Sequence, residues 1–164
     1  MKSPPTNPPP TNPPVRDSWY FAYGSNLHVQ QITARTKLPF TAGEHCQRAY
    51  LPNYQFAFNM RSEDGEYFAN LTWPGVGVPG VIYRCDAGAF EKLDVCETGY
   101  ERREVVVTTE AQEEVTAWVY LALPENARSR GRPNPAYLQV ILTGAREQGL
   151  PAEHIRQIEA LAWS

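Results

Sequence analysis

A glutamate in an unfavourable position is the first candidate for chemistry in this sequence. Residues 87–96 have a helical pattern, and Phe90, Leu93 and Glu97 lie at i, i+3 and i+7, which places the carboxylate on the apolar stripe. Glu97 also falls in the last turn, where the negative end of the helix dipole disfavours a negative charge. Both effects raise the pKa of a carboxylate, which can then exchange protons near neutral pH. A surface glutamate on a frayed helix end is the alternative that this segment alone leaves open.

A second candidate is a sharp turn at the end of an aromatic segment. All residues of Trp19–Tyr23 are aromatic or apolar, which is typical of a strand buried on both faces. The strand runs into Gly24-Ser25-Asn26, where glycine tolerates a positive φ and the Ser and Asn side chains can bond to their own backbone. The N–H groups of such a turn point in one direction and can bind an anion or oxyanion. By itself such a tripeptide is much more often an ordinary turn that has no function.

Three motifs occur in order along the chain. They are Tyr-Phe-Ala-Tyr-Gly-Ser-Asn-Leu at residues 20–27, Leu93-Asp94-x-x-Glu97 followed by Tyr100 and Arg102, and Asn134-Pro135-Ala136-Tyr137 followed by a Gly-Ala-Arg-Glu-x-Gly-Leu-Pro stretch at residues 144–151. Together they resemble the signatures of the gamma-glutamylcyclotransferase-like family. The resemblance implies an α+β fold in which a small mixed β-barrel-like sheet is flanked by helices.

The resemblance also implies a reaction and a set of site residues. These enzymes release 5-oxoproline (pyroglutamate) from gamma-glutamyl amides, and the glutamate of the second motif is the catalytic acid/base, a role that falls here on Glu97. The tyrosine of the third motif lines the substrate pocket, which implies Tyr137, although its helical spacing is equally typical of a core aromatic. The first motif would bind the substrate and its oxyanion through Tyr23, Gly24, Ser25, Asn26, Leu27 and His28.

One departure from the family pattern concerns the leaving group. The stretch Glu97-Thr98-Gly99-Tyr100 is shorter than the mammalian pattern, and Thr98 replaces the expected glycine. The shorter form resembles branches that act on gamma-glutamylamines or on gamma-glutamyl groups that protect an antibiotic intermediate. The identity of the leaving amine therefore stays open.

The implied chemistry needs no cofactor. The alpha-amine of a gamma-glutamyl group attacks its own gamma-carbonyl, so the enzyme has only to hold the reactive bend and to manage protons and charge. His28, His45 and His154 form no metal-ligand pattern. We therefore expect a small-molecule gamma-glutamyl substrate without metal or nucleotide. Two other functions remain open: a non-catalytic gamma-glutamyl-binding relative, and a hydrolase that releases free glutamate.

Two further groups of reactive or charged residues carry weaker signals. Cys96 adjoins Glu97, but neighbouring residues on a helix point about 100° apart, so we expect Cys96 to be a buried structural cysteine. Arg128, Arg130 and Arg132 lie on one loop, where they either hold a substrate carboxylate or, as we favour, simply solvate the loop.

Composition limits the classes of partner and compartment. The chain of 164 residues carries a formal charge of −3, which gives no support for binding to nucleic acid or to an anionic membrane surface. Its three cysteines show no Cys-x-x-Cys pairing, and no apolar stretch is long enough to span a bilayer. We expect a cytoplasmic protein that is a monomer or a homodimer.

Residues 1–16 contain seven of the chain's 15 prolines, so we expect a disordered tail followed by one domain at residues 17–164. In that domain the patterns predict strands and then a helix, more strands, and finally two helices, which is an α+β order. The predicted helices are 29–36, 87–96 (with Asp86 as N-cap and Gly99 as the C′ residue), one following Pro133-Asn134-Pro135, and one following Pro151. The predicted strands are 19–23, 46–60 with a break at 51–53, 67–73, 81–85, 102–109 and 115–123, and a Pro/Gly-rich loop is expected at 74–80.

Overall fold

The computed structural model describes residues 15–164, so most of the predicted proline-rich tail lies outside the described residues. The strands are β1 Ser18–Ala22, β2 Cys46–Leu51, β3 Gln55–Arg61, β4 Tyr67–Thr72, β5 Val78–Cys85, β6 Tyr100–Thr109 and β7 Glu114–Ala122. The α-helices are α1 Val29–Thr36, α2 Ala87–Cys96, α3 Pro135–Glu147 and α4 Ala152–Trp163, with short 3-10 turns η1 Ser25–Leu27 and η2 Pro124–Asn126. The predicted α+β order is confirmed.

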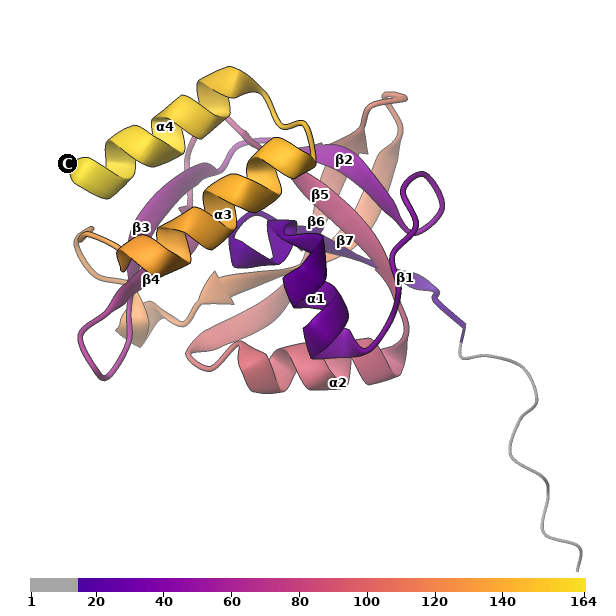
Figure 1. Cartoon of the computed structure of the whole chain (residues 1–164), viewed down its shortest axis with the longest axis horizontal. Helices are drawn as coiled ribbons and strands as arrows, with labels where there is room; N and C mark the ends of the chain where they lie inside the picture. Colours follow the sequence, from indigo (N-terminus) through magenta and orange to yellow (C-terminus); the bar gives the residue numbers. More distant parts are fainter. Residues whose placement is uncertain (1–14) are drawn as a thin grey trace, which may run out of the picture.

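Five strands form a closed barrel in the order β1-β5-β2-β6-β7 (Figure 1). Neighbouring strands are antiparallel, except that β1 runs parallel to β7 where the barrel closes. The sheet is therefore mixed, as predicted. Strands β3 and β4 form a separate antiparallel hairpin.

The aromatic strand β1 pairs with β5 on one side and with β7 on the other. Tyr20, Phe21 and Ala22 are buried, and Trp19 is partly covered by the Arg84 guanidinium, which lies 4.5 Å from the indole ring centre. Burial of large aromatic side chains contributes most of the hydrophobic free energy of a small core. The turn that follows β1 is thus fixed at one end by the barrel.

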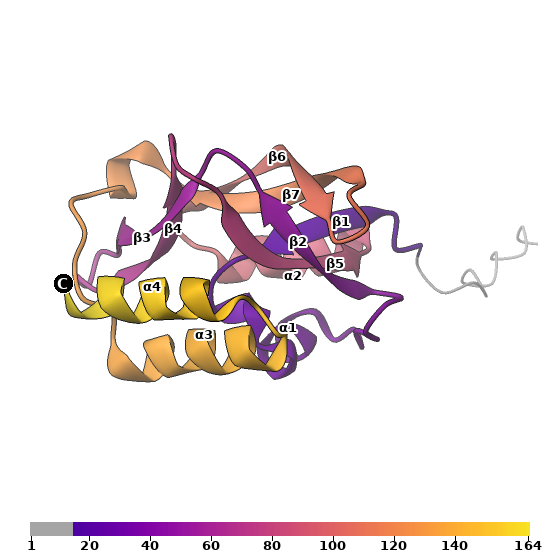
Figure 2. The same cartoon turned by 90° about the horizontal axis from the view of Figure 1, so that it is seen from above.

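The helices surround the barrel in two groups. Figure 2 shows α3 and α4 side by side along one side of the sheet structure, and α4 packs against the hairpin strand β3. The other pair, α1 and α2, contact each other, and α2 packs against β5. The hydrogen bond from the Ala89 N–H to Asp86 Oδ1, 2.7 Å long, confirms Asp86 as the predicted N-cap of α2.

The prediction of a loop at residues 74–80 is wrong at its end, because β5 begins at Val78 and includes Pro79 and Gly80. A Cβ atom on Gly80 would lie 2.5 Å from the Ala22 carbonyl oxygen and 2.6 Å from the Phe21 ring. The glycine therefore lets β1 and its aromatic side chains approach β5 closely, which is a known use of glycine within strands. The Pro/Gly-rich composition predicted a loop, but the glycine at position 80 is required for the packing of two strands.

A second close approach positions the turn after β1. Helix α3 crosses this turn at Gly144, where a Cβ atom would lie 2.4 Å from the backbone nitrogen of His28 and 2.6 Å from the carbonyl carbon of Leu27. Both obstacles are backbone atoms, so an alanine would force the helix and the turn apart.

We expect Gly144→Ala to lower the free energy of unfolding by about 1–3 kcal/mol, as overpacking does elsewhere, and to impair the site that the turn forms. Equilibrium urea denaturation measures the first effect. Gly88→Ala in α2 is the control, because its Cβ would make only an ordinary contact, 3.5 Å from Asp86 Oδ1. Equal stability of the two variants would contradict the proposed close fit.

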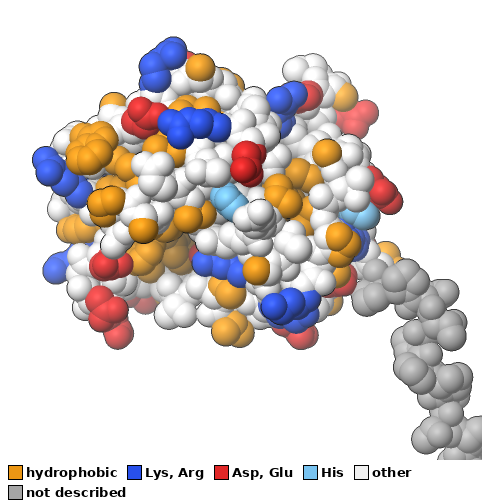
Figure 3. Space-filling model, viewed as in Figure 1, with side chains coloured by type: hydrophobic (Ala, Val, Ile, Leu, Met, Phe, Trp, Pro, Cys, Tyr) orange, Lys and Arg blue, Asp and Glu red, His pale blue; other side chains and the backbone are white. Residues whose placement is uncertain are grey.

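No helix of the described residues is long and apolar enough to cross a membrane. Basic and acidic side chains are interspersed on the face shown in Figure 3, in keeping with the small net charge.

Candidate active site

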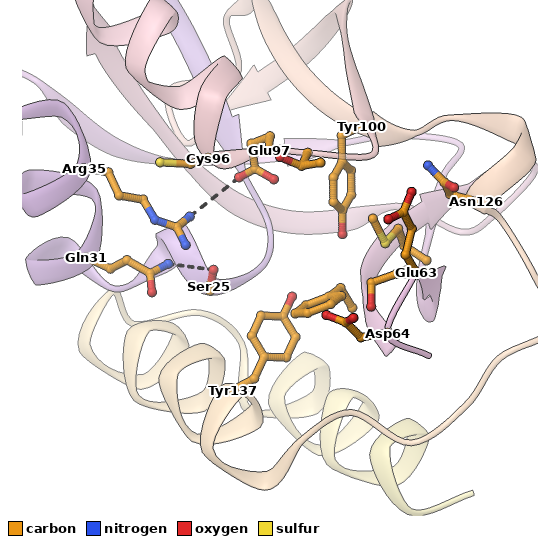
Figure 4. A pocket seen from close by; sticks show the side chains of 14 residues that line it. Ser25, Gln31, Arg35, Glu63, Asp64, Cys96, Glu97, Tyr100, Asn126 and Tyr137 are labelled. Carbon is orange, nitrogen blue, oxygen red and sulfur yellow. Dashed lines mark hydrogen bonds and ion pairs between the residues drawn. The ribbon is translucent and has the colours of Figure 1, made fainter. Parts of the chain in front are cut away.

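A cavity of about 480 Å³ opens where the turn after β1, the end of α2 and the start of α3 meet. It is bounded by polar and aromatic side chains from these elements and by the β3–β4 hairpin (Figure 4). Glu97, Ser25 and Tyr137, which come from three different predicted motifs, all line it. The fold therefore brings together residues that are more than 100 positions apart in the sequence.

Glu97 was predicted in the last turn of the helix, but it is the C-cap of α2, the residue directly after the last helical residue. Its N–H donates to the Leu93 carbonyl at 2.9 Å, which holds the backbone at the helix end, and its side chain is only 17% exposed. Gly99 has a φ of +91°, as expected for a glycine that stops a helix, but it lies two residues past the cap and is not the predicted C′ residue. Thr98 occupies that position instead.

The environment of Glu97 raises its pKa from about 4.5 to about 6. Burial is the larger cause, because it penalises the charged carboxylate, and the positive charge of Arg35 opposes it. Arg35 Nη1 lies 3.7 Å from Glu97 Oε1, and Asn26 Nδ2 donates to the same oxygen over 3.4 Å. Near neutral pH the carboxylate is thus largely ionised, yet it holds a proton more readily than a surface glutamate does.

Asn26 is the rigid centre of the turn, and it is almost fully buried. Its Nδ2 donates to the Tyr20 hydroxyl at 2.9 Å, and its Oδ1 accepts from Gln31 Nε2 and Arg35 Nη1, each at 3.1 Å. The Tyr83 hydroxyl donates to the Asn26 carbonyl at 2.7 Å. These bonds fix the direction of the turn relative to Glu97.

The predicted anion-binding turn uses some of its own donors. The Leu27 N–H donates to the Gly24 carbonyl at 3.0 Å, and the His28 N–H donates to the Ser25 carbonyl at 3.1 Å. A substrate can therefore meet only the N–H groups at the start of this turn, where a helix leaves its donors without intrahelical partners. Gly24 has a φ of −116°, so the turn does not use the positive φ that glycine tolerates.

The structure separates the predicted substrate-binding residues into two groups. Tyr23, Gly24, Ser25 and Asn26 line a small recess that also includes Glu97 and Tyr137. Leu27 is completely buried in the core, and His28 lines neither the recess nor the larger cavity.

Tyrosine side chains form much of the recess wall. The Tyr100 hydroxyl donates to the Ala69 carbonyl at 2.6 Å, while the Ala69 N–H donates to the Tyr137 hydroxyl at 3.0 Å. Burial raises the pKa of Tyr100 and of Tyr137 well above 10, so both phenols stay protonated at physiological pH. Tyr137 is held by this backbone bond and by its edge-to-face contact with Phe68, at 5.0 Å between ring centres.

Comparison with known proteins agrees with these motifs. A sequence model of the AIG2-like family matches residues 77–158. The chain is 32% identical over 152 residues to a mouse gamma-glutamylcyclotransferase, covering 87% of this chain and 77% of the mouse protein, and 31% identical over 156 residues to the human protein of the same name, with the same coverage. This chain belongs to the gamma-glutamylcyclotransferase-like family.

A solved structure titled gamma-glutamyl cyclotransferase superposes with a TM-score of 0.74 at 29% identity, covering 87% of this chain and 86% of the other. The family's barrel-and-helix architecture is therefore present here. Two other members of the second motif in this gamma-glutamylcyclotransferase-like chain, Asp94 and Arg102, make side-chain contacts with each other. Arg102 pairs with both Asp94 oxygens, at 3.0 and 3.2 Å, and the Tyr120 hydroxyl donates to Asp94 at 2.6 Å.

Among the cavity-lining residues of this gamma-glutamylcyclotransferase-like protein that the sequence did not indicate, two lie directly beside predicted site residues. Arg35 and Gln31 line the cavity from α1, beside Glu97 and Ser25 respectively. The sequence of this short helix gives no signal of function, and the packing of α1 on α2 brings Arg35 to Glu97. Arg128, Arg130 and Arg132 are exposed, and none of them lines this cavity.

The prediction that Cys96 is buried is wrong, because Cys96 is exposed and lines the cavity. It is the last residue of α2, and no further turn of the helix covers it. The two other cysteines, Cys46 and Cys85, are buried, and burial raises the pKa of their thiols to about 11 and about 12.

We therefore expect a bulky maleimide to modify Cys96 alone in the folded protein, since the thiolate is the reactive form, and to inhibit turnover by narrowing the cavity. Intact-protein mass spectrometry and residual activity measure the two effects. Cys96→Ser should keep near-normal turnover and resist the reagent. Inhibition of this variant, or labelling of a buried cysteine, would contradict the assignment.

Proposed function

We propose that this protein is a gamma-glutamylcyclotransferase that converts a gamma-glutamyl amide to 5-oxoproline and a free amine or amino acid. The observation that carries the proposal is the position of Glu97, a largely buried carboxylate with a pKa raised to about 6, beside the start of the turn after β1. The names of the mouse and human relatives, both gamma-glutamylcyclotransferases, support the same class of reaction.

The reaction requires three events, and the cavity offers a group for each. Glu97 accepts a proton from the substrate's alpha-ammonium group, which leaves a nucleophilic amine. That amine attacks the gamma-carbonyl carbon of the same molecule, so a C–N bond forms, a five-membered ring closes and the carbonyl oxygen becomes negative. N–H groups at the start of the turn, in residues 24–26, would stabilise this oxyanion.

The ring intermediate collapses when its oxygen re-forms the carbonyl and the bond to the leaving amine breaks. Glu97 gives its proton to the departing nitrogen, and it then takes the second proton from the positively charged ring nitrogen and passes it to the released amine, which leaves as an ammonium ion while the carboxylate returns to its ionised starting state. Because the nucleophile belongs to the substrate, this route uses no nucleophilic side chain. Holding the substrate in its bent conformation also lowers the barrier, because it places the amine and the gamma-carbonyl at reacting distance.

The outer part of the cavity leaves room for the departing group. Met60, Phe68, Glu63 and Asp64 line it from the β3–β4 hairpin, and Figure 4 shows both carboxylates on the side of the cavity away from Arg35. The gamma-glutamyl head would occupy the end formed by Glu97 and the turn, and the leaving amine would extend toward the hairpin.

A screen of gamma-glutamyl amino acids and gamma-glutamylamines, with 5-oxoproline as the readout, tests the proposal. We expect 5-oxoproline from at least one class of compound. Release of free glutamate would favour a hydrolase, and binding without any product would favour a non-catalytic relative.

A further inference from the structure

One positive charge stands out in the cavity. In the described part of the chain, residues 15–164, Arg35 is the only residue with a cationic side chain that lines the cavity. Its side chain is 30% exposed. Its Nη1 contacts Asn26 Oδ1 at 3.1 Å and Glu97 Oε1 at 3.7 Å. Within residues 15–164 its Nε and Nη2 groups have no hydrogen-bond acceptor in the protein. Half of the guanidinium fork is therefore available to a ligand.

A gamma-glutamyl substrate carries a charge that this fork would suit. Its alpha-carboxylate and its alpha-amine are attached to the same carbon, so whatever group binds the carboxylate also places the amine. A carboxylate that leaves water needs hydrogen bonds or a cation, and arginine matches it with two parallel N–H donors. On the hairpin side, Glu63 and Asp64 would repel a carboxylate, so the cavity favours one orientation of the substrate.

We propose that Arg35 binds the alpha-carboxylate of the gamma-glutamyl group and thereby places the alpha-amine against Glu97. This inference rests on the proposed cyclotransferase function and adds the residue that orients the reacting amine. The 3.7 Å separation of Arg35 Nη1 and Glu97 Oε1 lets adjacent groups of one amino-acid head meet the two side chains together. In Figure 4 the two side chains point toward each other at the same end of the cavity.

Binding would also change the proton affinity of Glu97 in the direction that the reaction needs. In the free protein the charge of Arg35 lowers the pKa of Glu97 against the effect of burial. A substrate carboxylate on Arg35 offsets that positive charge and so removes the effect that lowers the pKa of Glu97 in the free protein, while the neighbouring alpha-ammonium group supplies the proton.

A substrate pair separates this role from a purely structural one. The parent compound is a gamma-glutamyl amide, and its partner carries a neutral carboxamide in place of the alpha-carboxylate, with the alpha-amine intact. For the wild-type protein we expect kcat/KM to be lower for the carboxamide by roughly 10²-fold, the usual scale for truncating one partner of a desolvated charge pair.

The variant Arg35→Gln should lower kcat/KM for the parent by a similar factor and change kcat/KM for the carboxamide little. Arg35→Lys, which keeps the charge without the fork, should recover part of the loss for the parent. Arg132→Gln is the matched control, since Arg132 is exposed and lies outside this cavity, and both substrates should react with it as with the wild type.

If Arg35 only supports Asn26 and Glu97, Arg35→Gln will lower kcat/KM for both substrates equally, and the proposal fails. Equal kcat/KM of the two substrates with the wild-type protein also overturns it, even where the variant does not fold. Neither result affects the proposed function, which fails separately if the wild-type protein forms no cyclic product from any gamma-glutamyl compound.

Discussion

Replacement of Glu97 by Gln is expected to lower kcat by at least ~10²-fold while substrate still binds, because the amide keeps the size and polarity of the side chain but cannot exchange the proton. Steady-state kinetics with the best substrate from the screen measures this loss. Glu101→Gln is the control, since Glu101 already pairs with Arg103 in the described structure. Near-normal turnover of Glu97→Gln would show that the acid/base assignment is wrong.

The raised pKa of Glu97 predicts two pH-dependent effects, one on catalysis by the wild-type protein and one on the stability of the fold. Wild-type kcat/KM should fall as the pH drops below about 6, because protonated Glu97 cannot accept the amine proton. Stability moves in the opposite sense: the folded state binds this proton more tightly than the unfolded state does, so the stabilisation is present below the unfolded pKa and is lost as the pH rises through the folded pKa.

Ionised Glu97 therefore makes the fold less stable at neutral pH, by about 2 kcal/mol at most. We expect Glu97→Gln to unfold at the same or a higher urea concentration than the wild type at pH 8, with the difference vanishing in acid. A variant that is inactive and yet equally stable cannot owe its inactivity to misfolding.

Blocking the substrate's alpha-amine is the second change for which we expect a large effect, namely complete loss of reaction. A gamma-glutamyl amide acetylated at this nitrogen has no nucleophile for ring closure. The acetyl group adds bulk, so the matched compound is the glutaric acid monoamide, in which hydrogen replaces the amine and nothing is enlarged. Release of the leaving amine from either compound, followed by mass spectrometry, would indicate attack by water and contradict cyclisation.

Much of this architecture follows from local sequence. The aromatic run at residues 19–23 predicts a buried strand because few other environments accept such a density of large side chains. Glu97 is a candidate because a carboxylate on an apolar stripe and near the negative end of a helix is unfavourable. The structure confirms that its side chain is largely buried. The strand at Val78-Pro79-Gly80 was predicted as a loop. Position 80 must be glycine because a side chain there would collide with Phe21, which is distant in sequence, so local composition cannot reveal the reason.

The rest of the site depends on contacts that no local pattern encodes. Arg35 meets Glu97 only because α1 packs against α2, and the exposure of Cys96 depends on where the helix stops. The Leu27 and His28 N–H groups are used in backbone hydrogen bonds because residues 25–27 form the 3-10 turn η1. The Gly-Ser-Asn tripeptide predicts a turn but not this hydrogen-bonded type. Sequence thus identified the acid/base candidate but not the cation beside it.

The most direct test of the cyclotransferase reaction is to identify the first product of an unblocked gamma-glutamyl amide in ¹⁸O-labelled water. Cyclisation forms a bond between two atoms of the substrate, so we expect 5-oxoproline without the label and no free glutamate at early times. Free glutamate that carries ¹⁸O, with no 5-oxoproline, would contradict the account and show that this cavity activates water.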